Sequence, residues 1–352
     1  MKKILITGGC GFIGSNIAIY LKKNNIKNKI YCADNFYRKG SIENKKRLLK
    51  KDIAVIECDI RNKNDLNKVP EFDLLIDCAA DPSVATGYKN GLRYLIDTNL
   101  IGTLNCLNLV KRNSAKIIFL SSSRIYPFDI INASKYNIID KSFSPKINIL
   151  GLNKKKGINE NFQTTGLKTF YGFTKFSSEE LIKEYCYAYN IPYVINRCGV
   201  VAGPWQWGKI DQGFVVYWIL CYLFNKKLNY IGYGGKGYQV RDVLNINDLV
   251  KLISLQTHSF KKFDNELFNI GGGQSNKISL YNLTKKTDEM FGFEKKITRI
   301  KETRYGDIPY YVTDNTKIYK KCGWEPEINV LKTVEEIFDW IKTNQILWKK
   351  YL

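Results

Sequence analysis

Short apolar, β-rich runs alternate with helix-like stretches up to about residue 200 of the chain. Six runs are predicted to be strands: Lys3–Thr7, Lys29–Ala33, Ile53–Cys58, Leu74–Cys78, Lys116–Leu120 and Tyr193–Arg197. Strands that alternate with helices are typical of a parallel sheet with right-handed crossover connections. The pattern therefore predicts an α/β fold with a doubly wound parallel sheet, a Rossmann fold, over residues 1–197.

The pattern changes after Arg197, where Gly-, Tyr- and Trp-rich loops separate isolated helices. Helices are predicted over Gly213–Leu223, Ile246–Leu255 and Val334–Thr343. A run near residues 266–271, centred on Leu267–Ile270, predicts one more strand that returns to the main sheet. We therefore expect residues 198–265 and 272–352 to form mainly a smaller, discontinuous α/β lobe that binds the substrate.

The stretch from Pro127 to Lys168 is long and polar and contains three consecutive lysines. Loops of this length in compact domains usually have a function of their own. We expect this stretch to have a role such as covering a site.

The charge balance is strongly basic, with 55 Lys and Arg against 33 Asp and Glu and a net charge of +22. Most of the basic residues are lysines scattered along the chain, which indicates compositional bias and not a nucleic-acid binding stripe. The single histidine, His258, excludes a His-rich zinc site, and the nine cysteines form no C-x-x-C pair. No metal site or disulfide framework is expected. With no signal peptide and no long apolar run, we expect a soluble, cytoplasmic protein without a membrane partner.

A glycine-rich turn follows the first predicted strand and opens a helix. Gly9, Gly11 and Gly14 match the spacing G-x-G-x-x-G, and Gly8 extends the pattern. Such a turn lets the backbone approach a pyrophosphate at the N-terminus of the helix. The residues predicted to contact a dinucleotide here are Gly8, Gly11, Phe12, Ile13 and Gly14.

The end of the second predicted strand carries Asp34, followed by Asn35. An aspartate twenty residues after the last glycine of the turn is placed to accept hydrogen bonds from a ribose 2′-hydroxyl and to repel a 2′-phosphate. This favours NAD over NADP as the cofactor, although Arg38 and Lys39 nearby leave NADP open.

Small and polar residues follow the next strands in the same way. Asp59 and Ile60 come after the third strand, Ala79 and Ala80 after the fourth, and Asn99 in the next helix. Because ligands of doubly wound folds bind at the carboxyl ends of the strands, these five residues are predicted to contact the cofactor.

Tyr171 and Lys175 are one helical turn apart and on the same face, and the pair opens a helix predicted over Phe173–Tyr189. Transfer of a hydride from an alcohol carbon requires removal of the hydroxyl proton, and an unperturbed phenol is a poor base at neutral pH. A nearby ammonium and the positive nicotinamide would favour the phenolate. Tyr171 is therefore the predicted acid and base, and Lys175 its electrostatic partner and a ribose contact. A hydroxyl from the Ser121–Ser123 strand end is expected to orient the substrate oxygen.

These motifs, with the segments Gln239–Asp242 and Arg304–Asp307, resemble the extended short-chain dehydrogenase/reductase family over nearly the whole chain. This family contains the NAD-dependent nucleotide-sugar epimerases and dehydratases. The resemblance selects Ser122 as the catalytic hydroxyl and Ser123 as a substrate contact. It also implies that relatives pair through helices that flank the catalytic one, so a homodimer is expected.

Within the family, the 4,6-dehydratases have an Asp-Glu pair after the catalytic hydroxyl, whereas this chain has Ser123 and Arg124. Dehydration therefore lacks its acid and base. Three segments, 157–162, 203–214 and 234–242, are similar to the CDP-paratose (CDP-tyvelose) 2-epimerases, although Val200 replaces an asparagine that binds the sugar in many relatives. The predicted substrate contacts are Ser122, Ser123, Gln212, Gln239, Arg241 and Arg304.

Together these features predict an NAD-dependent epimerase that inverts C2 of a CDP-3,6-dideoxyhexose through a transient keto-sugar. Its substrate partner would be a nucleotide sugar, with a CDP-sugar favoured because of the resemblance. The arginines suit this ligand because guanidinium groups bind diphosphates with paired hydrogen bonds. A UDP-sugar 4-epimerase, a reductase that consumes NADPH and a non-enzymatic NAD-responsive binding protein are the alternatives.

Overall fold

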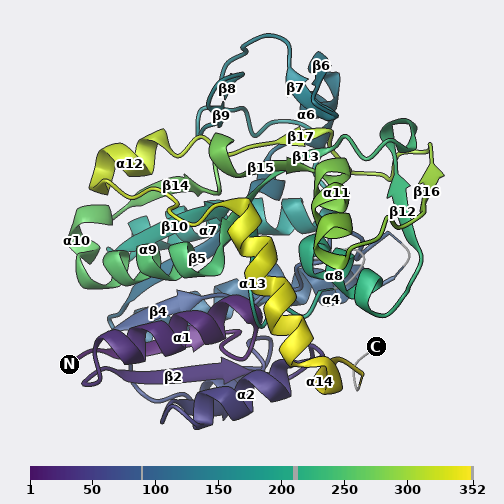
Figure 1. Cartoon of the computed structure of the whole chain (residues 1–352). Coiled ribbons are helices and arrows are strands. Elements are labelled where there is room, and N and C mark those ends of the chain that lie inside the picture. The colour runs from purple at the N-terminus through teal and green to yellow at the C-terminus, as the bar shows by residue number, and fades with distance from the viewer. Residues whose placement is uncertain (89, 209–212, 350–352) are drawn as a thin grey trace.

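Parallel strands form the central sheet in the computed structural model, which describes residues 1–88, 90–208 and 213–349 (Figure 1). From one edge to the other, the strands of this sheet are β3 (Ala54–Glu57), β2 (Lys29–Asp34), β1 (Lys3–Thr7), β4 (Leu74–Asp77), β5 (Lys116–Ser122), β10 (Tyr193–Cys198) and β14 (Glu266–Ile270). The six predicted strands and the returning strand are confirmed, with small differences at their ends. The predicted Rossmann fold is therefore confirmed.

The strand order reverses direction at β1, which lies between β2 and β4. Ile4 is paired with Ile30 on one side and with Leu74 on the other. The chain therefore adds β2 and β3 on one side of β1, and β4, β5, β10 and β14 on its other side. This reversal opens a crevice at the carboxyl ends of the strands, where doubly wound folds bind ligands.

Helices cover both faces of the sheet because alternate strand residues point to opposite faces. Ile4 and Ile6 pack on one face and Leu5 on the other. The first face is covered by α1 (Phe12–Asn24), α2 (Ser41–Leu49), α9 (Ile246–His258), α10 (Phe260–Phe263) and α12 (Thr316–Cys322). The second is covered by α3 (Lys63–Leu66), α5 (Gly102–Arg112) and α7 (Phe170–Ala188), and α4 (Leu92–Ile96) leads into α5 through a π-helical turn at Asp97–Ile101. No helix in the described part of the chain is long and apolar enough to cross a membrane.

Helix α9 falls within the range expected for the lobe, but it packs on the sheet beside α1. Leu249 and Ile253 of this helix are fully buried with Ile17 of α1. His258 is the exposed last residue of this helix. The division of the chain into two domains at residue 197 stays a prediction.

The lobe lies at the carboxyl end of the sheet because β11 (Val200–Ala202) follows β10 after a single residue, Gly199. Its main sheet contains β11, β13 (Val240–Asn245), β15 (Lys277–Ser279) and β17 (Tyr310–Tyr311). A second pair is formed by β12 (Leu228–Ile231) and β16 (Ile297–Ile300), and the helices are α8 (Phe214–Leu223), α11 (Leu280–Phe291), α13 (Val330–Thr343) and α14 (Gln345–Lys349). The helices predicted over Gly213–Leu223 and Val334–Thr343 are confirmed as α8 and α13.

The polar stretch between Pro127 and Lys168 is folded. It contains α6 (Phe128–Ala133) and two hairpins, β6–β7 (Tyr136–Ile139 and Ser142–Pro145) and β8–β9 (Leu152–Asn153 and Gly157–Ile158). The hairpins join the lobe, because the Phe143 N–H donates to the Tyr238 carbonyl at 2.9 Å and the Ile158 N–H donates to the Val312 carbonyl at 2.7 Å. This stretch therefore extends the lobe, at the top of Figure 1.

Candidate active site

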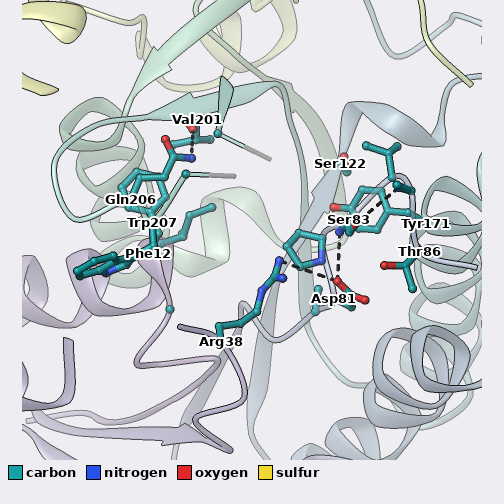
Figure 2. Close-up of a pocket in the computed structure, with 18 of the residues that line it drawn as sticks. Phe12, Arg38, Asp81, Ser83, Thr86, Ser122, Tyr171, Val201, Gln206 and Trp207 are labelled. Atoms are coloured by element: carbon teal, nitrogen blue, oxygen red, sulfur yellow. Dashed lines mark hydrogen bonds and ion pairs between the residues drawn. The ribbon is translucent and has the colours of Figure 1, made fainter. Parts of the chain in front are cut away.

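A cleft of about 1480 Å³ lies between the carboxyl ends of the strands and the lobe. Figure 2 shows its two ends: Phe12 and Trp207 lie at one end, and Ser122 and Tyr171 at the other. None of the residues from 127 to 168 lines this cleft, so the expectation that this stretch covers the site is wrong.

The glycine turn between β1 and α1 is too tight for any other residue type at two positions. Gly8 has a φ of 60°, and a Cβ on Gly14 would lie 2.4 Å from the Gly8 carbonyl oxygen. The Gly11 N–H closes the turn by donating to the Gly8 carbonyl at 2.9 Å. Helix α1 begins at Phe12 with no acidic residue in its first turn, so its N-terminal N–H groups present a positive dipole end to the cleft. The turn therefore fits the pyrophosphate of a dinucleotide.

Asp34 is fixed at the end of β2 by two backbone donors. Its carboxylate accepts hydrogen bonds from the N–H groups of Phe36 at 2.8 Å and Cys10 at 3.0 Å. Burial raises the pKa of Asp34, and these two hydrogen bonds oppose the rise. Arg38, in the loop that follows, forms an ion pair of 3.9 Å with Asp81 across the cleft (Figure 2). Asp34 is thus oriented toward the position where a cofactor ribose is expected.

Asn35 and Asp59 meet at the neighbouring strand ends. The Asn35 amide donates to Asp59 at 3.1 Å, and Arg61 forms an ion pair of 2.5 Å with the same carboxylate. Hydrogen bonds from Arg61 lower the pKa of Asp59 to about 2. Asp59 therefore stays ionised and holds Asn35 in place beside Asp34.

Most of the residues that the sequence predicts for the cofactor line the cleft together. They are Gly8, Gly11, Phe12, Ile13, Gly14, Asp34, Asn35, Asp59, Ile60, Ala79, Ala80 and Tyr171. Asn99 and Lys175 lie behind the wall, 1% and 2% exposed. The Asn99 side-chain oxygen accepts a hydrogen bond from the Asp81 N–H, and the Asn99 side-chain nitrogen donates to the Asp81 carbonyl. The same nitrogen donates to the Thr174 hydroxyl on α7 at 3.0 Å. Asn99 therefore positions the Asp81 loop against the helix that carries Tyr171.

Ser122 and Tyr171 lie beside each other at the far end of the cleft (Figure 2), close enough for the Ser122 hydroxyl to lower the pKa of Tyr171. Ser122 is the last residue of β5, and Tyr171 lies in the first turn of α7, whose N-cap Thr169 accepts from the Gly172 N–H at 3.1 Å. The helix approaches the strand end so closely that a Cβ on Gly172 would lie 2.1 Å from the Arg124 carbonyl oxygen. Ser122, and not Ser121, contacts Tyr171, because the Ser121 hydroxyl donates to Glu179.

Burial raises the pKa of Tyr171, and the nearby Ser122 hydroxyl and the positive charge of Arg124 oppose this rise. Lys175 lies one turn further along α7, with its ammonium 3.8 Å from the centre of the Phe119 ring. Burial lowers the pKa of Lys175, and the negative charges of Asp77 and Glu179 oppose that effect. Asp77, at the buried end of β4, was not predicted as a site residue. A carboxylate at the end of an otherwise apolar strand is the sequence signal by which it could have been found.

The substrate residues predicted from the lobe reach the cleft from β13 and from the segment before β17. Gln239, Arg241 and Arg304 line the cleft with Ser122 and Ser123, whereas Gln212 lies outside the described residues. Arg241 is held in place by Asp307 at 3.0 Å and by the carbonyls of Val240 and Ile308. Its guanidinium is therefore oriented before any ligand binds.

Arg124 also lines the cleft, and the sequence had marked it only as a departure from the dehydratase pattern. Its Nη1 donates to the Gly306 carbonyl at 3.2 Å. Burial and the nearby charge of Arg241 lower the pKa of Arg124 to about 10. Three guanidinium groups thus line the cleft, from Arg124 after β5 and from Arg241 and Arg304 of the lobe, and they suit an anionic ligand.

Comparison with known proteins agrees with this geometry. Residues 4–271 match the NAD dependent epimerase/dehydratase family. CDP-paratose 2-epimerase of Salmonella typhi is 28% identical over 96% of this chain and 98% of its own length. The crystal structure of UDP-glucuronic acid 4-epimerase from Bacillus cereus, in complex with UDP-glucuronic acid and NAD, superimposes with a TM-score of 0.78 at 25% identity, covering 97% of this chain and 99% of that one.

The UDP-glucose 4-epimerase of Thermotoga maritima, solved with UDP-glucose, shares the fold with a TM-score of 0.78 at 24% identity, covering 97% of this chain and 99% of that one. The family match spans the glycine turn, Asp34, Ser122 and the Tyr171–Lys175 pair, and its cofactor is NAD. The chain therefore belongs to the NAD dependent epimerase/dehydratase family of nucleotide-sugar enzymes.

Proposed function

We propose that the chain is a nucleotide-sugar epimerase that inverts C2 of a CDP-3,6-dideoxyhexose, interconverting CDP-paratose and CDP-tyvelose. The observation that carries the proposal is that Ser122 and Tyr171 lie beside each other in the same cleft as the glycine turn and the three guanidinium groups. An acid–base pair, a dinucleotide turn and an anion-binding wall are the three parts that a hydride-transferring sugar epimerase needs.

The proposed roles follow from the positions of the side chains. Tyr171 removes the proton from the sugar hydroxyl at the carbon to be inverted, and Ser122 orients that oxygen by hydrogen bonding. Bound NAD supplies the hydride chemistry, by taking up a hydride and returning it to the sugar. Lys175, buried behind Tyr171, contributes positive charge and a ribose contact. Tyr171 returns the proton when the keto-sugar is reduced on its opposite face, so no net oxidation occurs.

Retention of the keto-sugar depends on the lobe. Arg241 and Arg304 hold the diphosphate by charge-assisted hydrogen bonds while the sugar rotates about its link to the nucleotide. Because Arg241 is already fixed by Asp307, little side-chain entropy is lost when it binds the ligand.

Two neighbours of Ser122 favour epimerisation over dehydration. A 4,6-dehydratase needs an acid and a base beside the sugar, but Ser123 and Arg124 occupy those positions and line the cleft. The choice of C2 and of a CDP-sugar is supported by the similarity to the Salmonella typhi CDP-paratose 2-epimerase and by the three segments that resemble those enzymes. UDP-sugar 4-epimerisation is the second candidate, because both structural relatives described above are UDP-sugar 4-epimerases.

One experiment separates these functions. The purified protein is denatured to identify the nucleotide it releases, and the native protein is then incubated with CDP-paratose, CDP-tyvelose, UDP-glucose or UDP-glucuronic acid. Products are analysed by NMR, because inversion at C2 and at C4 changes different ring couplings. Inversion of UDP-sugars alone would replace the proposal with the second candidate. Net consumption of NADPH would indicate a reductase, and NAD binding without turnover would indicate a non-enzymatic binding protein.

The role of Tyr171 is tested by Tyr171→Phe, which removes the hydroxyl and keeps the ring. We expect turnover to collapse while NAD remains bound. Tyr187→Phe, on the exposed end of the same helix, is the matched control because its side chain is 86% exposed. Near-normal epimerisation by the Tyr171→Phe protein would rule out the assignment.

We also propose that the chain forms a homodimer through the helices that flank the sheet beside α7. The support is the family resemblance together with Phe173 on α7, which is 51% exposed, and Ile101 before α5, which is 41% exposed. Sedimentation velocity measures the mass directly. A monomer at micromolar concentration would rule out the dimer.

A further inference from the structure

Four tryptophans from three segments of the chain form one cluster at the end of the cleft opposite Tyr171. Trp207 lies in the loop before α8, Trp340 in α13 and Trp348 in α14. The ring centres of Trp207 and Trp348 are 4.6 Å apart, and both rings contact Trp340, at 6.2 Å and 5.4 Å. Trp205 completes the cluster at 5.7 Å from Trp340. We call these four side chains the tryptophan cluster.

The tryptophan cluster rests directly on the dinucleotide-binding side of the molecule. Gly40, in the loop that follows Asp34, lies so close that a Cβ there would meet the Trp207 ring at 2.3 Å. The Arg47 guanidinium of α2 lies 4.6 Å from the centre of the Trp205 ring and donates to Asn16 of α1 at 2.6 Å. The cluster therefore joins the lobe to the two elements that follow the glycine turn and Asp34. Figure 1 shows α13 running from the lobe toward α2, with α14 at its end.

The backbone beneath the cluster is held in an unfavourable conformation. Trp205 has a φ of 72°, a region that a bulky side chain rarely adopts. Such a residue persists only where the surrounding contacts fix it, and these conformations gather at binding sites and clamps. Here the contacts of Trp205 with Arg47 and Trp340 hold the turn, which directs Trp207 back over Gly40.

Two members of the cluster face the cleft itself. Both Trp207 and Trp348 line it. Figure 2 shows Trp207 beside Phe12 and away from Ser122, and Trp348 packs against Trp207. Trp348 is 2% exposed although it lies in a short helix of five residues. A side chain from this last described helix thus forms part of the wall around the predicted dinucleotide site.

We propose that Trp207, supported by Trp348, closes the cofactor end of the cleft and slows the release of NAD. The inference rests on the proposed function in one respect: an epimerase must return the hydride to the sugar from which it came, so its cofactor should stay bound through turnover. In this proposal the dinucleotide leaves past the contact between Trp207 and Gly40. Release therefore requires the tryptophan cluster to separate from the loop after Asp34.

The test measures release of the cofactor, without substrate. The protein is loaded with NADH, excess NAD is added as a trap, and the decay of energy transfer from tryptophan to NADH gives the release rate. Trp348→Ala is expected to release NADH at least tenfold faster than the unaltered chain. Ile346→Ala is the matched control, because this neighbour on α14 is 88% exposed, and its release rate should stay within twofold.

A second variant covers the possibility that Trp348→Ala does not fold, which circular dichroism detects. Trp207→Phe keeps an aromatic ring but shortens the reach over Gly40, and it should release NADH severalfold faster. With either variant, turnover that declines over time should be restored by added NAD. Release that is unchanged in a folded variant overturns the proposal. A failure of the proposed function is distinguishable, because it changes the NMR products and leaves the release rates as they are.

Discussion

Glu179 and Arg197 form a buried ion pair beneath the catalytic residues, and breaking it should cost the protein much of its stability. The two side chains are 0% and 4% exposed, and they are joined by bonds of 2.7, 3.0 and 3.2 Å. Burial opposes the charge of Arg197, but Glu179 and its hydrogen bonds hold the pKa of Arg197 above the ordinary value. Ser121 also donates to Glu179, so the pair links α7 to both β5 and β10.

Glu179→Gln keeps the shape of the side chain and removes its charge. The Arg197 guanidinium is then buried without its counter-charge, which in other proteins costs about 3–5 kcal/mol. We expect a loss of this size in the free energy of unfolding, measured by urea denaturation with circular dichroism. Glu180→Gln is the matched control, because Glu180 is 50% exposed and its ion pair with Lys183 is of a kind worth about 0–1 kcal/mol.

Restoring neutrality provides an independent check. In the double variant Glu179→Gln with Arg197→Met, no charge is left buried, so part of the lost stability should return. If Glu179→Gln costs no more than about 1 kcal/mol beyond Glu180→Gln, the reasoning from burial is refuted. The glycine turn and Asp34 are unchanged in every variant, so their contribution to NAD binding should persist.

Three further outcomes are expected. Gly14→Ala should weaken NAD binding more than tenfold by calorimetry, because its Cβ would lie 2.4 Å from the Gly8 carbonyl oxygen; unchanged affinity would contradict the role of the turn. Arg241→Met should weaken CDP binding by roughly ten- to a hundredfold, because a hydrogen bond to a charged group contributes about 1.5–3 kcal/mol. The affinity for NAD should not change. Arg124→Met should move the acidic limb of the pH profile of kcat to higher pH, because Arg124 opposes the rise in the pKa of Tyr171 and Tyr171 must be deprotonated to act as a base. The control Arg299→Met, at an exposed position, should leave the limb in place. A shift of the limb to lower pH in Arg124→Met would contradict this reasoning.

Local patterns predicted the framework of the site because they depend on neighbours in sequence. The apolar runs became β1 to β5, β10 and β14, since all of them except the edge strand β3 fill strands that are largely buried between two layers of helices. The glycine turn and the Tyr171–Lys175 spacing are equally local, and they need only the turn or the helix to form. Their positions in the cleft follow from the strand ends to which they are attached.

Residues that meet through tertiary contacts were not predicted in the same way. Asn99 was predicted to contact the cofactor from the helix after the fourth strand, but it lies in a π-helical turn and its amide forms hydrogen bonds with Asp81 and Thr174 behind the cleft wall. The ion pair between Arg38 and Asp81 joins loops after two different strands. The contact between Trp207 and Trp348 depends on how α14 returns to the cleft, which no nearby residue determines.

The placement of Lys175 shows how the sheet determines what a local motif can do. Spacing alone puts Lys175 beside Tyr171, but the parallel pairing of β4 with β5 places Asp77 beneath the same helix. Burial alone would favour the neutral amine, and the carboxylates of Asp77 and Glu179 oppose that tendency. The carboxylates of Asp77 on β4 and Glu179 on α7 therefore stabilise the Lys175 ammonium that the chemistry requires, while Tyr171 lines the cleft. A Tyr–Lys pair elsewhere in this chain, without a buried carboxylate under the lysine, would lack that support.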